Sequence, residues 1–290
     1  MTVKQLSTLT AANQRLTEFA KVVNGQQPVR KVKSNEVLRT GIDLGTSSIV
    51  LTVLDEANQP LYGAFEYDHA VRDGIIVNFI ESVQILKRLK AKAERVLGVE
   101  LVTACGAVPP GTGEGSSRIV TNVIEAADFI CQQIVDEPTA AAEFLHIETG
   151  TVVDIGGGTT GISTFKNGKL MEVLDEPTGG FHMSLVLAGS RHIDSDKAEL
   201  IKRDPEMESE VFAVIRPVVE KMATITRTMV KTEIPLPIIV VGGAINFKDF
   251  IPTFSKSLKL PAEKPVYPQF VTPLGIAMYD KKNRSTKDRD

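Results

Sequence analysis

The chain has 290 residues, enough for two domains of ordinary size, and 42% apolar with 24% charged residues is typical of a soluble globular protein. Its net charge of −3 supplies no basic surface for nucleic acid, and no apolar run approaches the roughly 18 residues of a membrane span. The N-terminus lacks the apolar core of a secretion signal, and both cysteines, Cys105 and Cys131, lie in apolar strand-like runs, which predicts buried thiols in a reducing cytoplasm.

Residues 1–36 stand apart from the rest of the chain. Apolar residues recur at helical intervals from about Ser7 to Val23, and a polar, turn-rich linker follows them. We favour a helix that docks on the surface of its own protein. A helix that binds a partner is the alternative, and the sequence leaves it open.

Residues 37–67 predict three strands, over 37–43, 49–55 and 61–67. The link between the first two carries one acidic residue and then glycine and hydroxyl residues, namely Asp43, Gly45, Thr46, Ser47 and Ser48. A glycine turn between two strands can direct several backbone N–H groups into one concavity, which binds phosphate oxygens. The carboxylate just before such a turn can hold a Mg²⁺ ion that bridges those oxygens.

Residues 68–80 are expected to form a loop, and a helix is predicted from Ser82 to Val96 with Gly98 as its stop. A strand follows, and then PPGTGEGSSR (109–118), which superficially resembles a nucleotide P-loop. It lacks the Gly-Lys-Ser/Thr ending of that motif. We interpret it as a flexible turn before a helix over 117–127, with contact to phosphate as a minority interpretation.

A strand over 129–136 leads directly into Glu137, Pro138, Thr139 and three alanines. Pro138 suits the first position of a helix, and the alanines give that helix a slim face that another backbone can approach closely. Glu137 either simply begins the helix or orients a water molecule beside a phosphate site. Spacing alone does not decide between the two.

The stretch TVVDIGGGTTGIS (151–163) repeats the first hairpin, with Asp154 before Gly156, Gly157, Gly158 and Thr159. A third strand, over 169–175, completes a second run of three strands. Two such runs, each followed by helices that alternate with strands, predict an internal duplication in the α/β class. Both glycine turns would then face one interdomain cleft.

The remaining chain predicts helices over 181–187 and from Met207 to about Lys231, with an N-cap at Asp194 or Ser195 between them. An apolar strand over 235–244 ends at Gly242 and Gly243, and the turn there is a second place for ligand contact. A proline-rich loop over 261–270, a closing helix over 271–279 and a disordered charged tail complete the prediction.

Six stretches resemble, in the same order, the nucleotide-binding motifs of the actin, sugar-kinase and heat-shock-chaperone nucleotidase superfamily. They are GIDLGTSS (41–48), DEPTAAA (136–142), VDIGGGTTGIS (153–163), ELIK (199–202), VVGGA (240–244) and PLGIAMY (273–279). The resemblance implies a duplicated actin-like ATPase fold of the α/β class, in which two ribonuclease-H-like domains with reduced upper lobes flank a nucleotide cleft. The layout is most similar to a small chaperone-like branch encoded with the ethanolamine-utilisation enzymes of bacterial microcompartments.

The same resemblance implies a division of the chain. Residues 1–36 would form the N-terminal helix and linker, 37–149 with 266–280 the first actin-like domain, 150–265 the second, and 281–290 a flexible tail. It also implies ATP and Mg²⁺ as cofactors and a location in the bacterial cytoplasm, in association with a microcompartment. The partners would be client proteins, namely ethanolamine-utilisation enzymes or shell proteins.

Roles for individual residues follow from the resemblance. Gly45 and the turn Thr46 to Ser48 would bind the β- and γ-phosphates with Asp43 near the metal, while Asp154 would hold Mg²⁺ through water. Glu137 would orient the attacking water. The other contacts would come from Gly156, Gly157, Gly158 and Thr159 to the phosphates, from Glu199 and Lys202 beside the adenosine, and from Gly242, Gly243 and Ala244 to its base and ribose.

The chain also departs from the chaperone pattern. Gly161 stands where DnaK-type chaperones carry an aspartate, and no lysine clearly matches their phosphate-reaching lysine. The first functional hypothesis is therefore a slow Mg-ATPase switch that assists ethanolamine-utilisation proteins. The alternatives are a non-hydrolysing actin-like scaffold or adaptor and, ranked last, a small-molecule kinase, because the chain is short of the insertions that build such a substrate pocket.

Overall fold

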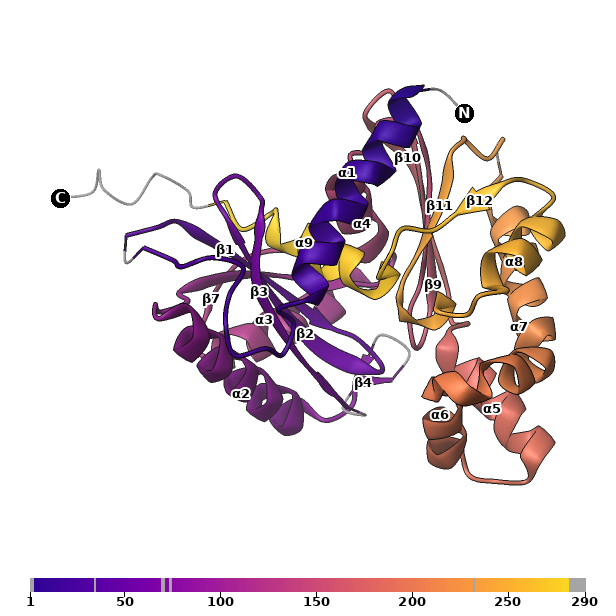
Figure 1. Ribbon diagram of the computed structural model, residues 1–290, viewed down its shortest axis with the longest axis horizontal. Coiled ribbons are helices and arrows are strands. Elements are labelled where there is room, and N and C mark those ends of the chain that lie inside the picture. The colour runs from indigo at the N-terminus through magenta and orange to yellow at the C-terminus, as the bar shows by residue number, and fades with distance from the viewer. Residues whose placement is uncertain (1–2, 34, 69–70, 73–74, 232, 282–290) are drawn as a thin grey trace.

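The structure is a computed structural model that describes residues 3–33, 35–68, 71–72, 75–231 and 233–281. It contains two five-stranded sheets that stand side by side, with helices packed on both (Figure 1). The predicted charged tail lies outside the described residues from position 282 onward. None of the described helices is long and apolar enough to cross a membrane.

The first sheet has the strand order β3-β2-β1-β6-β7. Its first three strands run antiparallel along the chain, and β6 and β7 then add parallel to β1. The strands are β1 (Leu38–Leu44), β2 (Ser48–Asp55), β3 (Pro60–Tyr67), β6 (Thr103–Val108) and β7 (Ile130–Asp136). Helices α2 (Phe79–Leu97) and α3 (Gly113–Ala126) bury their apolar faces against this sheet, and a two-stranded hairpin, β4 (Val71–Arg72) with β5 (Ile75–Ile76), precedes α2.

The second sheet repeats that order as β10-β9-β8-β11-β12. Its strands are β8 (Gly150–Ile155), β9 (Thr160–Lys166), β10 (Lys169–Glu176), β11 (Ile238–Val241) and β12 (Ala262–Glu263). The helices of this half are α5 (Gly180–Arg191), α6 (Ser195–Arg203), α7 (Glu208–Met229) and α8 (Phe250–Leu258). The matching order of antiparallel and parallel strands confirms the internal duplication, and the two halves are the first and second domains below.

Two helices connect the domains and cross each other between the sheets (Figure 1). Helix α4 (Glu137–Leu145) leads from β7 into β8, and α9 (Val271–Ala277) follows the second domain and packs back on β1. A β-carbon on Gly275 would lie 1.9 Å from the carbonyl oxygen of Ala140, so the two backbones touch at this crossing. The close approach that the alanine run predicted is therefore confirmed.

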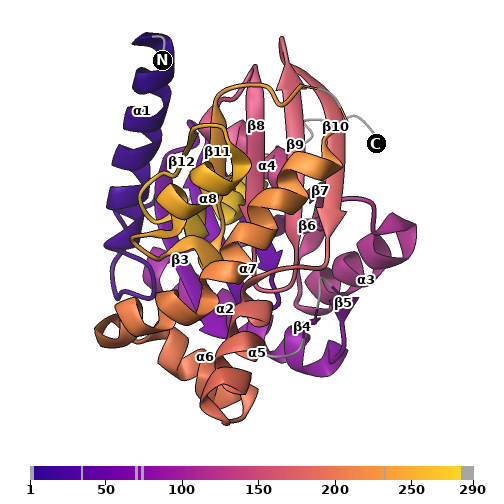
Figure 2. The same cartoon turned by 90° about the vertical axis from the view of Figure 1, so that its right-hand side faces the viewer.

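Helix α1 (Val3–Ala20) docks on the body of the protein through its C-terminal half. Leu16 and Phe19 are fully buried in a cluster that includes residues of both domains. The Arg15 guanidinium donates to the Phe144 carbonyl oxygen at 2.8 Å, and the backbone N–H of Val266 donates to the Asn13 side chain at 2.9 Å. The docked-helix interpretation is supported, while the N-terminal end of α1 stands at the side of the sheets (Figure 2).

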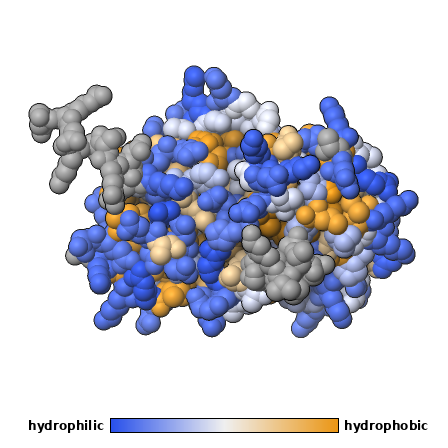
Figure 3. Space-filling model, turned by 90° about the horizontal axis from the view of Figure 1, so that it is seen from above, coloured by the Kyte–Doolittle hydropathy of each residue, from blue (hydrophilic) through white to orange (hydrophobic). Residues whose placement is uncertain are grey.

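The face seen from above is mostly hydrophilic, and its hydrophobic residues form small separate areas (Figure 3). Such scattered apolar residues are ordinary for a protein surface. On the edge strand β7, Ile130 is 57% exposed. The neighbouring Cys131 is only partly buried, so the prediction of two buried thiols is confirmed for Cys105 alone.

Helix boundaries differ from the sequence prediction in α2, α3 and α5, and α2 begins at Phe79 rather than at Ser82. Helix α3 begins at Gly113 rather than at Ser117, so the stretch expected to be a flexible turn supplies the first turn of the helix. Helix α5 continues four residues past Leu187, to Arg191. Gly98 has the left-handed conformation, φ 72°, that ends α2 as expected.

Candidate functional site

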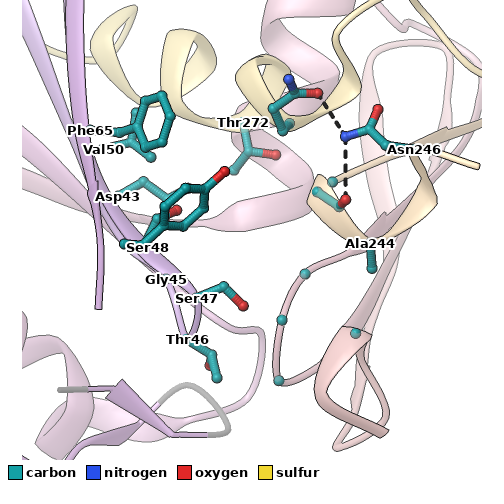
Figure 4. Close-up of a pocket in the computed structure, with 18 of the residues that line it drawn as sticks. Asp43, Gly45, Thr46, Ser47, Ser48, Val50, Phe65, Ala244, Asn246 and Thr272 are labelled. Carbon is teal, nitrogen blue, oxygen red and sulfur yellow. Dashed lines mark hydrogen bonds between the residues drawn. The ribbon is translucent and has the colours of Figure 1, made fainter. Parts of the chain in front are cut away.

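The turns of the two hairpins face each other across one cavity of about 460 Å³, a size that suits a small-molecule ligand. Figure 4 shows the first turn on one side of it, Ala244 and Asn246 on the other, and Thr272 between them. Every residue predicted for the nucleotide site lines this cavity: Asp43, Gly45, Thr46, Ser47, Ser48, Glu137, Asp154, Gly156, Gly157, Gly158, Thr159, Glu199, Lys202, Gly242, Gly243 and Ala244.

The two turns have the same closing hydrogen bond. In the first, the Gly45 N–H donates to the Ser48 carbonyl oxygen at 3.1 Å, and in the second the Gly156 N–H donates to the Thr159 carbonyl oxygen, also at 3.1 Å. Each turn thus folds back within four residues, as a backbone nest for an anion requires. The turns belong to different domains and contact each other through Gly157 and Ser47.

The second turn is fixed from behind by the start of α5. The N–H groups of Gly180 and Phe181 donate to the carbonyl oxygens of Gly156 and Gly157 at 2.9 and 2.7 Å. Because these carbonyl oxygens point toward α5, the carbonyl side of the turn is satisfied within the domain. This arrangement keeps negatively polarised oxygens of the turn away from an anion in the cavity.

Three carboxylates gather between the turns. Burial, together with neighbouring Asp154, raises the pKa of Asp43 to about 7. Burial likewise raises the pKa of Asp154 to about 6, although the Thr272 hydroxyl, which donates to its Oδ2, opposes the rise. The pKa of Glu137 is held well above its usual value by burial and by the charges of Asp43 and Asp154. The free carboxylates therefore favour a cation or protons in this part of the cavity.

The carboxylates in the cavity suit Mg²⁺ better than a metal ion whose ligands all come from the protein. Among the described residues, no three histidine, cysteine or acidic side chains converge closely enough to ligate a metal. Mg²⁺ typically keeps several waters and takes one or two carboxylates together with phosphate oxygens. Asp43 and Asp154, facing two phosphate-type nests, provide that kind of donor set.

A largely buried ion pair forms part of the cavity wall in the second domain. The Lys202 ammonium lies 2.6 Å from Glu199 Oε2 and donates to the Gly180 carbonyl oxygen at 2.8 Å and to Ser184 Oγ at 2.9 Å. Burial opposes the ionisation of Glu199, but Lys202 and Arg203 outweigh it and hold the pKa of Glu199 below its usual value. The pair thus links α5 to α6 and fixes the wall on which Glu199 stands.

Several residues that line the cavity were not predicted because they lie outside the six motifs. They are Phe65, Tyr67, Arg203, Asn246, Phe247, Gln269, Phe270 and Thr272, among others. The Asn246 amide donates to the Gln269 side chain at 3.1 Å and to the Gly243 carbonyl oxygen at 3.3 Å, which positions the VVGGA turn. Arg203 could have been predicted, because it directly follows ELIK in the sequence. Together with Lys202 it supplies all the positive charge among the described lining residues.

Asp175, which is not among the residues that line the cavity, was also missed, and it lies beside Gly161, where DnaK-type chaperones carry an aspartate. A β-carbon on Gly161 would already lie 3.0 Å from Pro138 Cγ, so a larger side chain has little room there. Asp175 pairs with Gly161 across β9 and β10, and paired residues of adjacent strands project to the same face. The chain therefore carries a carboxylate one strand away from the place where the chaperone pattern has one.

Comparisons with known proteins agree with this geometry. A family model described as "Hsp70 protein" matches residues 80–251. The ethanolamine utilization protein EutJ of Salmonella typhimurium is 38% identical over 245 residues, which cover 84% of this chain and 86% of that protein. The crystal structure of EutJ from Carboxydothermus hydrogenoformans has a TM-score of 0.87 at 41% identity and covers 93% of this chain and 99% of its own. MreB5 of Spiroplasma citri, solved with AMPPNP, has the same fold, with a TM-score of 0.64 at 16% identity over 82% of this chain and 94% of that one.

Proposed function

The chain belongs to the EutJ family of proteins with the Hsp70-like and actin-like fold, and on that basis we propose that it binds ATP with Mg²⁺ in the interdomain cleft. In this proposal the bound nucleotide sets the angle between the domains, and slow hydrolysis resets it. The observation that carries the proposal is the pair of identically closed turns that face each other across Asp43 and Asp154.

The phosphates would lie between the two turns, and Asp43 and Asp154 would hold Mg²⁺. When bound, the ion supplies positive charge against the phosphate oxygens. The chain supplies little such charge itself, because Lys202 and Arg203 are the only positively charged residues among the described residues that line the cavity, and both are paired with Glu199. The backbone N–H groups of the two turns would carry the remaining electrostatic stabilisation.

Glu137 is proposed to orient the attacking water. It begins α4, whose N-cap is Asp136 with its side chain accepting from the Thr139 N–H at 3.0 Å, so the helix holds the glutamate backbone rigidly at the cavity wall. A carboxylate that positions water for attack on a phosphate must lie within hydrogen-bond reach of that water. Glu137 lines the same cavity as both turns, which is compatible with that role.

The adenosine would occupy the end of the cavity formed by the second domain. There Glu199 and Lys202 stand on one wall, and Gly242, Gly243 and Ala244 form the other. Gly242 has φ 99°, and a β-carbon on it would lie 2.3 Å from the Ile155 carbonyl oxygen, so this turn requires glycine. The bare backbone would leave a flat surface for the base.

The clients of the switch are proposed to be ethanolamine-utilisation enzymes or the shell proteins of a microcompartment. This proposal is supported by the name of two relatives, ethanolamine utilization protein EutJ, since the similarity to each of them extends over most of this chain and most of the relative. A chaperone-like role fits the Hsp70 family model. The clients would respond to the interdomain angle rather than to the nucleotide itself.

A second candidate is a non-hydrolysing scaffold or adaptor that uses the nucleotide only to fix its shape. The observation that favours it is Gly161, where crowding by Pro138 disfavours the aspartate of the chaperone pattern. Both candidates require nucleotide binding, and they differ in phosphate release.

The test is to titrate ATP calorimetrically with Mg²⁺ and with EDTA, and to follow phosphate release from the same sample. Mg²⁺-dependent binding with slow release supports the switch. Binding without release supports the scaffold. Absence of heat in both titrations, with a folded protein by circular dichroism, would overturn both.

A further inference from the structure

One contact joins the two domains at the edge of the cavity. Arg203, the last residue of α6 in the second domain, places its guanidinium carbon 3.9 Å from the ring centre of Tyr67, the last residue of β3 in the first domain. That distance is well within the range of a cation–π interaction. Both residues line the cavity, and Tyr67 is 59% exposed, so the contact lies at the rim of the site.

The guanidinium is held in place from its own domain. Arg203 Nε donates to Glu199 Oε1 at 2.7 Å, and the other carboxylate oxygen of Glu199 lies 2.6 Å from the Lys202 ammonium. A carboxylate that grips the Nε edge leaves the flat face of the guanidinium available for stacking. Arg203 therefore presents a fixed planar cation to the first domain.

The aromatic ring is supported from the other side. Phe65 contacts Tyr67 edge to face with ring centres 5.2 Å apart, and Phe270 lies 6.4 Å from Phe65. Phe19 of α1 contacts Phe270 edge to face at 5.2 Å. A continuous row of four rings thus runs from the buried half of α1 to the rim of the cavity, and it fixes the position of Tyr67.

We propose that Tyr67 and Arg203 form an interdomain latch that holds the cleft closed over its ligand. Tyr67 is then a positioning residue, because it acts on the nucleotide through Arg203 and the domain angle. A planar stack between two domains is lost as soon as they rotate apart, so the latch contributes free energy to the closed form alone. The link to nucleotide retention rests on the proposed function, whereas the link to the domain angle does not.

The experiment measures two quantities on four variants and the unaltered protein. The variants are Tyr67→Ala, Tyr67→Phe, Arg203→Lys and Arg216→Ala. The last is the matched control, because the Arg216 guanidinium stands 5.9 Å over Phe212 within the second domain. The first quantity is the interdomain distance without nucleotide, from spin labels at exposed positions Gln84 on α2 and Lys197 on α6 in a Cys131→Ser background. The second is the dissociation rate of a fluorescent ATP analogue with Mg²⁺.

We expect Tyr67→Ala and Arg203→Lys to shift the distances to longer values and to raise the dissociation rate about fivefold, the factor expected of one cation–π contact at a partly exposed site. Tyr67→Phe and Arg216→Ala should behave like the unaltered protein, because the first keeps the ring face and the second leaves the latch intact. Unchanged distances in Tyr67→Ala, or an equal shift in Tyr67→Phe, would overturn the latch. If no variant binds the analogue, the proposed function fails, and the distances still decide the latch.

Discussion

Gly157 of the second glycine turn lies directly against Ser47 of the first, and a β-carbon on Gly157 would stand 2.3 Å from Ser47 Oγ. The two domains approach each other here with no space for a methyl group. We therefore predict that Gly157→Ala separates the turns and weakens ATP binding by at least about tenfold, or about 1.4 kcal/mol. Gly156→Ala is the control, since its nearest neighbour would be the Thr159 carbonyl oxygen at 3.9 Å. Equal affinities of the two variants in calorimetry would contradict the prediction.

Glu137→Gln should separate binding from hydrolysis. The amide keeps the shape of the side chain but cannot accept a proton or orient water as a carboxylate does, so we expect phosphate release to fall by about a hundredfold while ATP affinity changes little. Glu143→Gln, at an exposed position of the same helix, is the control and should leave both unchanged. A Glu137→Gln variant that releases phosphate at the unaltered rate would remove this residue from the mechanism.

The paired aspartates predict a stability that depends on pH. Burial raises the pKa of Asp43 to about 7 and that of Asp154 to about 6, whereas in the unfolded chain both lie near their ordinary value of about 4. As pH falls from 8 toward 4, the folded protein takes up these protons first. Without Mg²⁺, the free energy of unfolding should therefore rise in this range, by an amount on the order of 2–4 kcal/mol.

Urea unfolding in EDTA at pH 8, 6.5 and 5 measures this dependence. Asp43→Asn should be more stable than the unaltered protein at pH 8 and should show a flatter profile, because it removes the buried charge. Addition of Mg²⁺ at pH 8 should stabilise the unaltered protein. Stability that increases from pH 5 to pH 8 in EDTA is the outcome that this account does not allow.

Phe19→Ala tests whether α1 is part of the folded body. The ring is fully buried, and it fills the space that Gly63 leaves, where a β-carbon would lie 2.3 Å from Phe19 Cζ. We expect a loss of about 3–4 kcal/mol in the free energy of unfolding. Gln14→Ala, at an exposed position of the same helix, should change stability by less than about 0.5 kcal/mol. A loss below about 1 kcal/mol for Phe19→Ala would mean that α1 contributes little to the fold.

The strands and turns around the two aspartates were predictable because their pattern is local. Runs of β-branched residues, interrupted by glycine, determine both where the chain extends and where it turns back, and the two copies support each other. The glycine-rich stretch over 109–118 was predicted to be a flexible turn, but in the structure α3 begins at Gly113. Glycine is weak evidence about a helix start, since it is tolerated both in turns and in the first turn of a helix.

Contacts between distant parts of the chain could not be predicted from the sequence. The hydrogen bond from Thr272 to Asp154 joins residues of α9 and β8, and the stack of Arg203 on Tyr67 joins α6 to β3. The separation of the two residues along the chain does not indicate either contact, because both contacts depend on how the two domains face each other. Asp175 was missed for a related reason, as only the register of β9 and β10 places it beside Gly161.

The crossing of α4 and α9 at Ala140 and Gly275 acts as a fulcrum. The chain passes between the domains through these two helices, and their backbones are already in contact, so the domains can tilt about this point but can hardly slide. A small rotation at a fulcrum becomes a large displacement at the end of a long arm, and α5 and α6 lie at the far end of the second domain (Figure 1). A molecule in the cleft could thereby change the outline of the protein most strongly at α5 and α6.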